Sequence, residues 1–167
     1  MGAKTKKAAA LVALALGMAG AMAAPQAPTW RYSDGADPVT KAPARWAAVQ
    51  SANVVQLSAP YAGGTRATLT VRDVGGELAL YLTIDRGQLW CPRRCDIITR
   101  VDDADAADWG AVPADAGNTR SIFLGAPALM LDRITAGRVL VVSVDTFRDG
   151  PSFFRFNVAG LRWPDAR

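Results

Sequence analysis

The feature that most constrains the fold is a pair of alternating segments joined by two glycines. Residues 66–73 alternate between apolar and polar side chains, and residues 77–86 do so more regularly. A period of two is typical of a β-strand with one buried face. The intervening Gly75-Gly76 is typical of a tight hairpin turn. The sequence therefore predicts an antiparallel β-hairpin. Its inward-facing residues are Leu69 and Val71 in the first strand, and Leu78, Leu80, Leu82 and Ile84 in the second.

The remainder of the chain predicts more strands and a single helix. A helix is predicted over residues 127–136, because Pro127 suits a first helical position and Gly137 a C-terminal stop. Two loops are predicted, over residues 60–64 and residues 102–117. Further strands are predicted over residues 53–57, 96–101, 120–125, 138–147 and 152–158, the last with Phe154, Phe156 and Val158 facing inward. This order favours an all-β fold, a mostly antiparallel β-sandwich or open barrel with one short helix.

The front of the chain has the pattern of a cleaved secretory signal peptide over residues 1–24. Three lysines precede an apolar run, and small residues at alternating positions suit cleavage after Ala23 or Ala24. The run is short and rich in Ala and Gly, which disfavours a membrane anchor. The protein is therefore expected to be periplasmic or secreted, with no membrane span after cleavage. Residues 25–45 are predicted to be a loosely ordered segment, and residues 46–167 a single β-rich domain.

Signal cleavage also changes the charge of the protein. Removal of Lys4, Lys6 and Lys7 takes the formal net charge from +4 to +1. The remaining basic residues are scattered rather than clustered, so the sequence argues against a nucleic-acid partner.

The residue types present limit the available chemistry. The chain contains no His, which removes the usual Ser and Cys catalytic arrangements and the commonest zinc ligand. It has no glycine-rich phosphate loop of standard spacing. Glu77 is its only Glu, so a carboxylate pair for glycoside hydrolysis would have to come from Asp residues. The sequence thus predicts a protein that is not an enzyme and has no catalytic residues, cofactor or metal.

Cys91 and Cys95 form the most informative local motif. Two thiols in an oxidising compartment are expected to form a disulfide bond. Redox enzymes place two residues between such cysteines at a helix N-terminus, whereas three separate them here, between strand-like segments. A structural disulfide that shapes a loop tip is therefore favoured over a redox pair. Arg93 and Arg94 would project from this tip as candidates for binding an anion or an acidic surface. A solvated loop is the simpler alternative.

Two other patterns are compatible with both a ligand and an ordinary structural role. The acidic cluster Asp102, Asp103, Asp105 and Asp108 could begin a calcium loop, but it lacks the expected Gly and closing Glu, which favours a solvated loop. The five Trp residues could line a sugar-binding face, but core packing is favoured because most lie at the ends of predicted strands.

Short segments spread along the chain carry a resemblance to known proteins: Trp30-Arg31-Tyr32, Asp37-Pro38-Val39-Thr40, Ser51-Ala52-Asn53, Pro60-Tyr61-Ala62-Gly63-Gly64, the strand ending in Arg72, Gly87-Gln88, Phe154-Arg155-Phe156 and Gly160-Leu161. On these segments the chain resembles a family of small β-rich periplasmic proteins of proteobacteria, and more distantly the accessory proteins of type VI secretion. The resemblance implies an all-β domain and supplies no catalytic residues. Residues between the cysteines vary in this family, so the Arg93-Arg94 tip is not part of the resemblance. Tyr61 and Gln88, which are part of it, are the other candidate binding residues.

These observations lead to three hypotheses of function. The first is a non-catalytic periplasmic binding or assembly protein of the bacterial envelope, accessory to a secretion system, whose partner is an envelope protein or glycan. The second is an inhibitor or immunity protein that plugs a hydrolase with the Cys91–Cys95 loop. The third is an enzyme that uses Asp, Tyr and Arg, and it requires an acidic pocket.

Overall fold

A computed structural model describes residues 30–164 of the chain, so the predicted signal peptide lies outside the described residues. Within this range the protein is mostly β, with one short helix, as the sequence predicted. The strands are β1 (Arg31–Ala36), β2 (Pro43–Gln50), β3 (Val55–Leu57), β4 (Gly63–Thr65), β5 (Ala67–Val74), β6 (Glu77–Ile84), β7 (Cys95–Val101), β8 (Ala107–Pro113), β9 (Ser121–Leu124), β10 (Val139–Thr146) and β11 (Gly150–Asn157). Helix α1 (Pro127–Ala136) lies between β9 and β10 in the chain.

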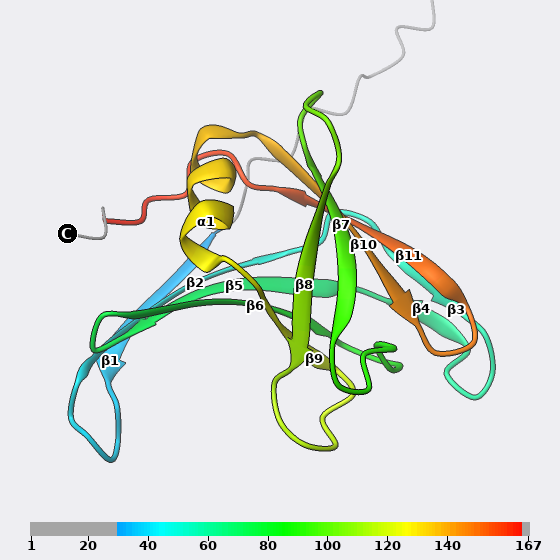
Figure 1. Cartoon of the computed structure of the whole chain (residues 1–167), viewed down its shortest axis with the longest axis horizontal. Coiled ribbons are helices and arrows are strands. Elements are labelled where there is room, and N and C mark those ends of the chain that lie inside the picture. Colours follow the sequence, from blue (N-terminus) through cyan, green and yellow to red (C-terminus); the bar gives the residue numbers. More distant parts are fainter. Residues whose placement is uncertain (1–29, 165–167) are drawn as a thin grey trace, which may run out of the picture.

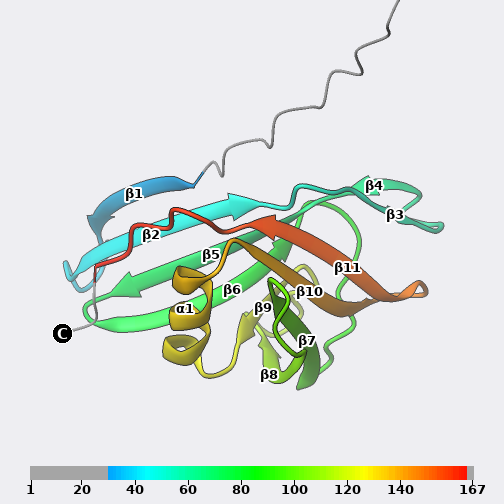
Figure 2. The ribbon, with the colours of Figure 1, turned by 90° about the horizontal axis from the view of Figure 1, so that it is seen from above.

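Nine strands form one antiparallel sheet in the order β1-β2-β5-β6-β9-β8-β7-β10-β11, and β3 and β4 form a small second sheet. The large sheet bends so that its two halves face each other across the core (Figures 1 and 2). It is not closed into a barrel. The bend brings the last strand close to the segment that follows β2, where the Ala52 amide donates a hydrogen bond to the Arg155 carbonyl over 2.7 Å. The architecture is therefore a sandwich-like fold built from one curled sheet.

The core is formed by the apolar side chains that alternate with polar ones along the strands, as the sequence predicted. The inward residues Leu69, Leu80 and Leu82 of the β5–β6 hairpin are fully buried, and so are Phe154 and Phe156 of β11. Helix α1 adds its one apolar side to the same core through Met130, Leu131 and Ile134. The predicted helix bounds and the Gly137 C-cap are confirmed. A period-two pattern on both halves of the sheet and a single apolar helix face are thus enough to fill the interior.

Two regions differ from the sequence-based expectation. The segment expected to be loosely ordered covers residues 25–45, and its described part from residue 31 forms β1 and the start of β2. All six residues of β1 are exposed, so this edge strand is held by backbone pairing and leaves no apolar alternation to detect. Residues 107–113, expected to belong to a long loop, form β8. Its inward positions are held by only two residues, Trp109 and Ala111, which is too short a pattern to stand out among Asp and Gly.

The order and register of the strands place two groups of loops at opposite ends of the sheet. The β1–β2 and β5–β6 turns lie at one end, because Ala44 pairs with Val74 and Val74 with Glu77. At the other end, Gln50 pairs with Thr68 and Thr68 with Thr83. A strand of eight residues spans roughly 26 Å, so these ends are separate surfaces.

Candidate functional site

The predicted disulfide is present in the structure. Cys91 and Cys95 are bonded, with their Cα atoms 5.1 Å apart. Cys91 is buried among the core residues, whereas Pro92, Arg93 and Arg94 are exposed. The bond therefore anchors a short loop to the core and holds two guanidinium groups outside it.

The segment before this loop extends the sheet. The Trp90 amide donates to the Asp145 carbonyl over 2.8 Å, and the Phe147 amide donates to the Gln88 carbonyl over 2.9 Å. Leu89 between them is buried and forms an isolated bridge with Thr146. Residues 88–90 are therefore fixed beside the end of β10, with their outward side chains at the β10–β11 turn.

A direct hydrogen bond joins two of the predicted candidate residues. The Gln88 Nε2 atom donates to the Tyr61 hydroxyl over 2.7 Å, although 27 residues separate them in sequence. The Tyr61 loop is also attached to the β10–β11 turn, because the Ser58 amide donates to the Asp149 carboxylate over 3.1 Å. Three segments that are distant in sequence thus meet at this end of the sheet.

Exposed aromatic and cationic side chains cover the junction. The Trp90 side chain is 55% exposed and packs on Phe147, with ring centroids 5.8 Å apart. The Arg148 guanidinium lies 5.5 Å from the Phe147 ring centroid, within cation–π range. We call the surface formed by Tyr61, Gln88, Trp90, Phe147 and Arg148, together with the Arg93-Arg94 tip, the loop-end surface.

The sequence found part of this surface and missed the rest. The structure joins Tyr61 to Gln88 and places Arg93 and Arg94 on the adjoining disulfide loop. Trp90, Phe147 and Arg148 were not predicted. Trp90 stands directly before the first cysteine, and this was the available signal, since an aromatic residue next to an exposed loop tip is well placed for binding. Nothing local connects Phe147 to it.

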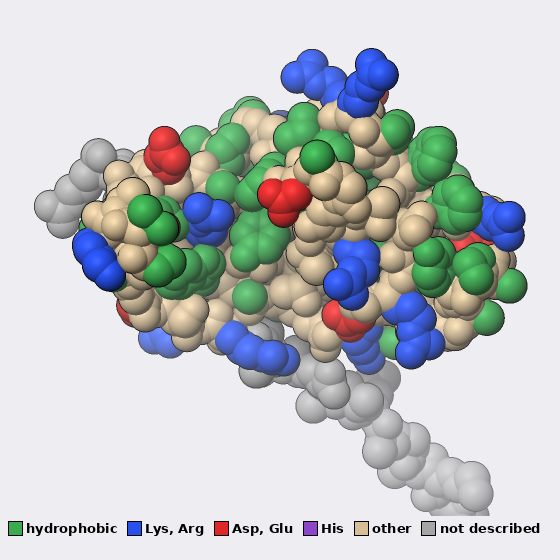
Figure 3. All heavy atoms as spheres, turned by 90° about the horizontal axis from the view of Figure 1, so that it is seen from below, with side chains coloured by type: hydrophobic (Ala, Val, Ile, Leu, Met, Phe, Trp, Pro, Cys, Tyr) green, Lys and Arg blue, Asp and Glu red, His purple; other side chains and the backbone are tan. Residues whose placement is uncertain are grey.

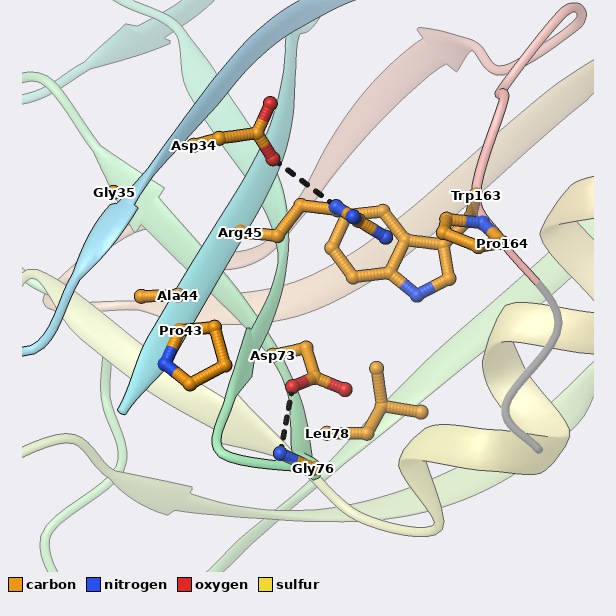
Figure 4. Close-up of a pocket in the computed structure, with 10 residues that line it drawn as sticks. All are labelled: Asp34, Gly35, Pro43, Ala44, Arg45, Asp73, Gly76, Leu78, Trp163 and Pro164. Carbon is orange, nitrogen blue, oxygen red and sulfur yellow. Dashed lines mark hydrogen bonds and ion pairs between the residues drawn. The ribbon is translucent and has the colours of Figure 1, made fainter. Parts of the chain in front are cut away.

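A cleft lies at the opposite end of the sheet, between the β1–β2 hairpin, the β5–β6 turn and the C-terminal segment (Figure 4). Its volume is about 410 Å³. One wall carries the ion pair of Arg45 with Asp34, at 3.1 Å, and the other carries Trp163. The Asp73 carboxylate accepts the Gly76 amide over 2.9 Å and so closes the β5–β6 turn. None of the predicted site residues lines this cleft.

Several of the carboxylates accept hydrogen bonds from backbone amides. Asp37 Oδ1 accepts the amides of Thr40, at 2.7 Å, and Val39, at 3.0 Å. These bonds, the Thr40 backbone bond foremost, hold the pKa of the Asp37 carboxyl below its ordinary value. Asp102, from the predicted acidic cluster, accepts the amides of Arg138 and Val139. Among residues 30–164, no group of three or more acidic or Cys side chains is arranged to hold a metal ion.

Charged groups are otherwise little paired. The Asp34–Arg45 contact is the one ion pair in the described part of the chain. Basic side chains are spread over the face seen from below in Figure 3, some of them side by side, and acidic ones are fewer. No helix of the described residues has the length and hydropathy needed to span a membrane. Many guanidinium groups of residues 30–164 thus have no carboxylate of that range at contact distance.

No protein-family model, curated protein or solved structure matches this chain. The fold and the loop-end surface define it only as a β-sandwich-like protein with one disulfide-closed, arginine-bearing loop.

Proposed function

We propose that this protein is a non-catalytic, exported binding or assembly protein of the bacterial envelope, and that the loop-end surface contacts its partner. The observation that carries the proposal is that three loops meet at one junction, which presents the exposed Trp90, the half-buried Tyr61 and Arg148, with the Arg93-Arg94 tip on the same connection as Trp90. Trp, Tyr and Arg are the residues most enriched among those that dominate binding energy at protein interfaces. Service to a secretion apparatus is the pathway suggested by the family resemblance.

The charges of the surface point to an acidic partner protein. Arg93, Arg94 and Arg148 are exposed, and none forms an ion pair within the described residues. Asp149, the acidic residue nearest to Arg148 in sequence, is occupied by the Ser58 amide. A carboxylate-rich partner would supply the missing counter-charges and accept bidentate bonds from the guanidinium groups.

Capture from envelope extracts tests the proposal. The immobilised mature protein is expected to retain a specific envelope protein, and the charge-reversal variant Arg93→Glu/Arg94→Glu is expected to lose it. Arg31→Glu/Lys41→Glu is the matched control, because it reverses two exposed charges on the β1–β2 hairpin and should retain the partner. Equal capture by both variants, or capture of no specific partner, would count against the proposal.

Export itself is tested separately. The chain expressed with its own first 24 residues is expected to appear in the periplasm or medium with an N-terminus at Ala24 or Pro25, as read by intact mass spectrometry. Retention in the cytoplasm at full mass would contradict export.

The disulfide tip also favours a second candidate, an inhibitor or immunity protein. Pro92, Arg93 and Arg94 are all exposed on a loop closed by a covalent bond, and such a pre-organised loop loses little conformational entropy when it enters a cleft. A one-to-one complex with a cell-wall hydrolase and loss of that hydrolase's activity are expected in this case. Unchanged activity across a panel of lysozymes and amidases would exclude it.

A further inference from the structure

Three neighbouring strands expose a row of arginines far from the loop-end surface. Val141 in the centre of β10 pairs with Arg100 of β7 on one side and with Arg155 of β11 on the other. Neighbouring strands lie about 4.8 Å apart, so the two arginine Cα atoms are roughly 10 Å apart across Val141. Their side chains leave the same face of the sheet, since all three residues occupy one cross-strand row.

A third arginine completes a pocket over this row. Arg138, directly before β10, lines a pocket of about 410 Å³ together with Arg100, Arg155, Val139 and Val141. None of the three guanidinium groups makes a hydrogen bond or an ion pair within residues 30–164. Cationic side chains that share a pocket repel one another, and a bound anion reduces that repulsion.

Two carboxylates, Asp102 and Asp103, also line the pocket. Asp102 is already engaged, because its oxygens accept the amides of Arg138, at 3.1 Å, and Val139, at 2.8 Å. Asp103 is exposed to solvent. The pocket therefore carries three cationic groups and two carboxylates, and its formal charge is positive. One of the two carboxylates, Asp102, already accepts backbone hydrogen bonds.

We propose that this arginine pocket, formed by Arg100, Arg138 and Arg155, binds a phosphate group. A phosphate dianion offers enough oxygens for bidentate bonds to more than one guanidinium, and arginine geometry matches it. The exposed Ile98 and Phe153 pair with Ser143 in the adjoining cross-strand row, so an apolar part of the ligand can lie beside the phosphate. The pocket is separate from the loop-end surface and does not depend on the proposed function.

Calorimetric titration of the mature protein with inorganic phosphate and with pyrophosphate tests the proposal at low ionic strength. Arg100→Gln/Arg155→Gln is expected to weaken binding by about tenfold or more, the loss expected from one or two charge-assisted hydrogen bonds. The control Arg31→Gln/Arg72→Gln removes two arginines outside the pocket and should bind like the parent. Arg100→Lys/Arg155→Lys keeps the charge but not the bidentate geometry, and it should bind with intermediate affinity.

A second arm identifies where the phosphate comes from. Co-sedimentation with phosphatidylglycerol vesicles, against phosphatidylcholine vesicles, is compared for the parent and Arg100→Gln/Arg155→Gln proteins. Binding of free phosphate or pyrophosphate alone indicates a small phosphorylated ligand, and arginine-dependent sedimentation with the anionic vesicles indicates a lipid headgroup. Absence of both, or binding that the control double variant weakens as much as the pocket variant does, overturns the proposal.

Discussion

At the scale of single residues, Asn53 connects the two halves of the sheet. Its Nδ2 atom donates to the Phe153 carbonyl and its Oδ1 atom accepts the Arg155 amide, both over 2.8 Å. The side chain thus takes the place of a neighbouring strand for one repeat along the outer edge of β11. The sheet is not closed into a barrel, so no further strand pairs with the outer edge of β11 in the described residues. The Asn53 side chain and the Ala52 amide bond to backbone groups of this edge instead.

Replacement of Asn53 by Ala should therefore destabilise the protein more than a typical surface change. Two hydrogen bonds worth about 1 kcal/mol each are lost, so the free energy of unfolding should fall by about 2 kcal/mol. Urea unfolding followed by tryptophan fluorescence measures this change. Gln56→Ala is the control, because Gln56 is exposed on β3 and should change stability by less than about 0.5 kcal/mol. If the two variants are equally stable, Asn53 does not hold the β11 edge.

Asp37 provides a pH-dependent prediction at the same scale. Its pKa in the folded protein is lowered from 3.8, chiefly by the Thr40 backbone hydrogen bond, so the charged form stabilises the folded state. That contribution is present above the unfolded pKa and is lost as the pH falls from about 3.8 through the lower folded pKa. The parent protein should therefore lose its stability advantage over Asp37→Asn in this acidic range. An NMR titration that places the Asp37 carboxyl at or above its ordinary pKa would contradict this.

At the scale of elements, the disulfide bond fixes the conformation of its loop more than it stabilises the fold. The bond closes a ring of only five residues, and the chain-entropy model assigns such a ring about 2 kcal/mol. The paired variant Cys91→Ala/Cys95→Ala should keep its circular dichroism spectrum and lose about that much stability in urea. It should also lose the partner captured by the loop-end surface. Unfolding of this variant at room temperature would show that the bond holds the fold itself.

The elements that could be predicted are those whose sequence pattern and end signals lie in one continuous stretch of the chain. The β5–β6 hairpin carries its alternation and its Gly75-Gly76 turn in one continuous stretch, and α1 carries Pro127 and Gly137 at its two ends. Strand β1 could not be predicted, because every side chain in it is exposed and its partner β2 alone defines it. The loop-end surface was found only in part for a related reason. Phe147 meets Trp90 through the pairing of residues 88–90 with the end of β10, a contact that no local pattern records.

At the scale of the whole molecule, the two edge strands of the sheet differ in how their outer backbone groups are hydrogen-bonded. The β11 edge is covered by Ala52 and Asn53, whereas β2 is the one strand partner of β1 among residues 30–164. Exposed strand edges invite pairing with another chain, and charged side chains on the edge oppose it. Arg31 and Asp34 supply such charges on β1. Within the described residues, the sheet thus has one covered edge and one uncovered edge that carries charged side chains.

The register of β1 predicts which of its amides are open to solvent. Asp37 donates its amide to the Ala42 carbonyl, and Pro43, which has no amide, pairs with Ala36. Because hydrogen-bonded and non-bonded pairs alternate in an antiparallel ladder, the other bonded positions of β1 are odd-numbered and the outward amides even-numbered. Hydrogen exchange followed by NMR should therefore protect Arg31, Ser33 and Gly35 and leave Tyr32, Asp34 and Ala36 nearly unprotected. Uniform protection of all six at high protein concentration, lost on dilution, would instead show that a second copy of the chain pairs along this edge.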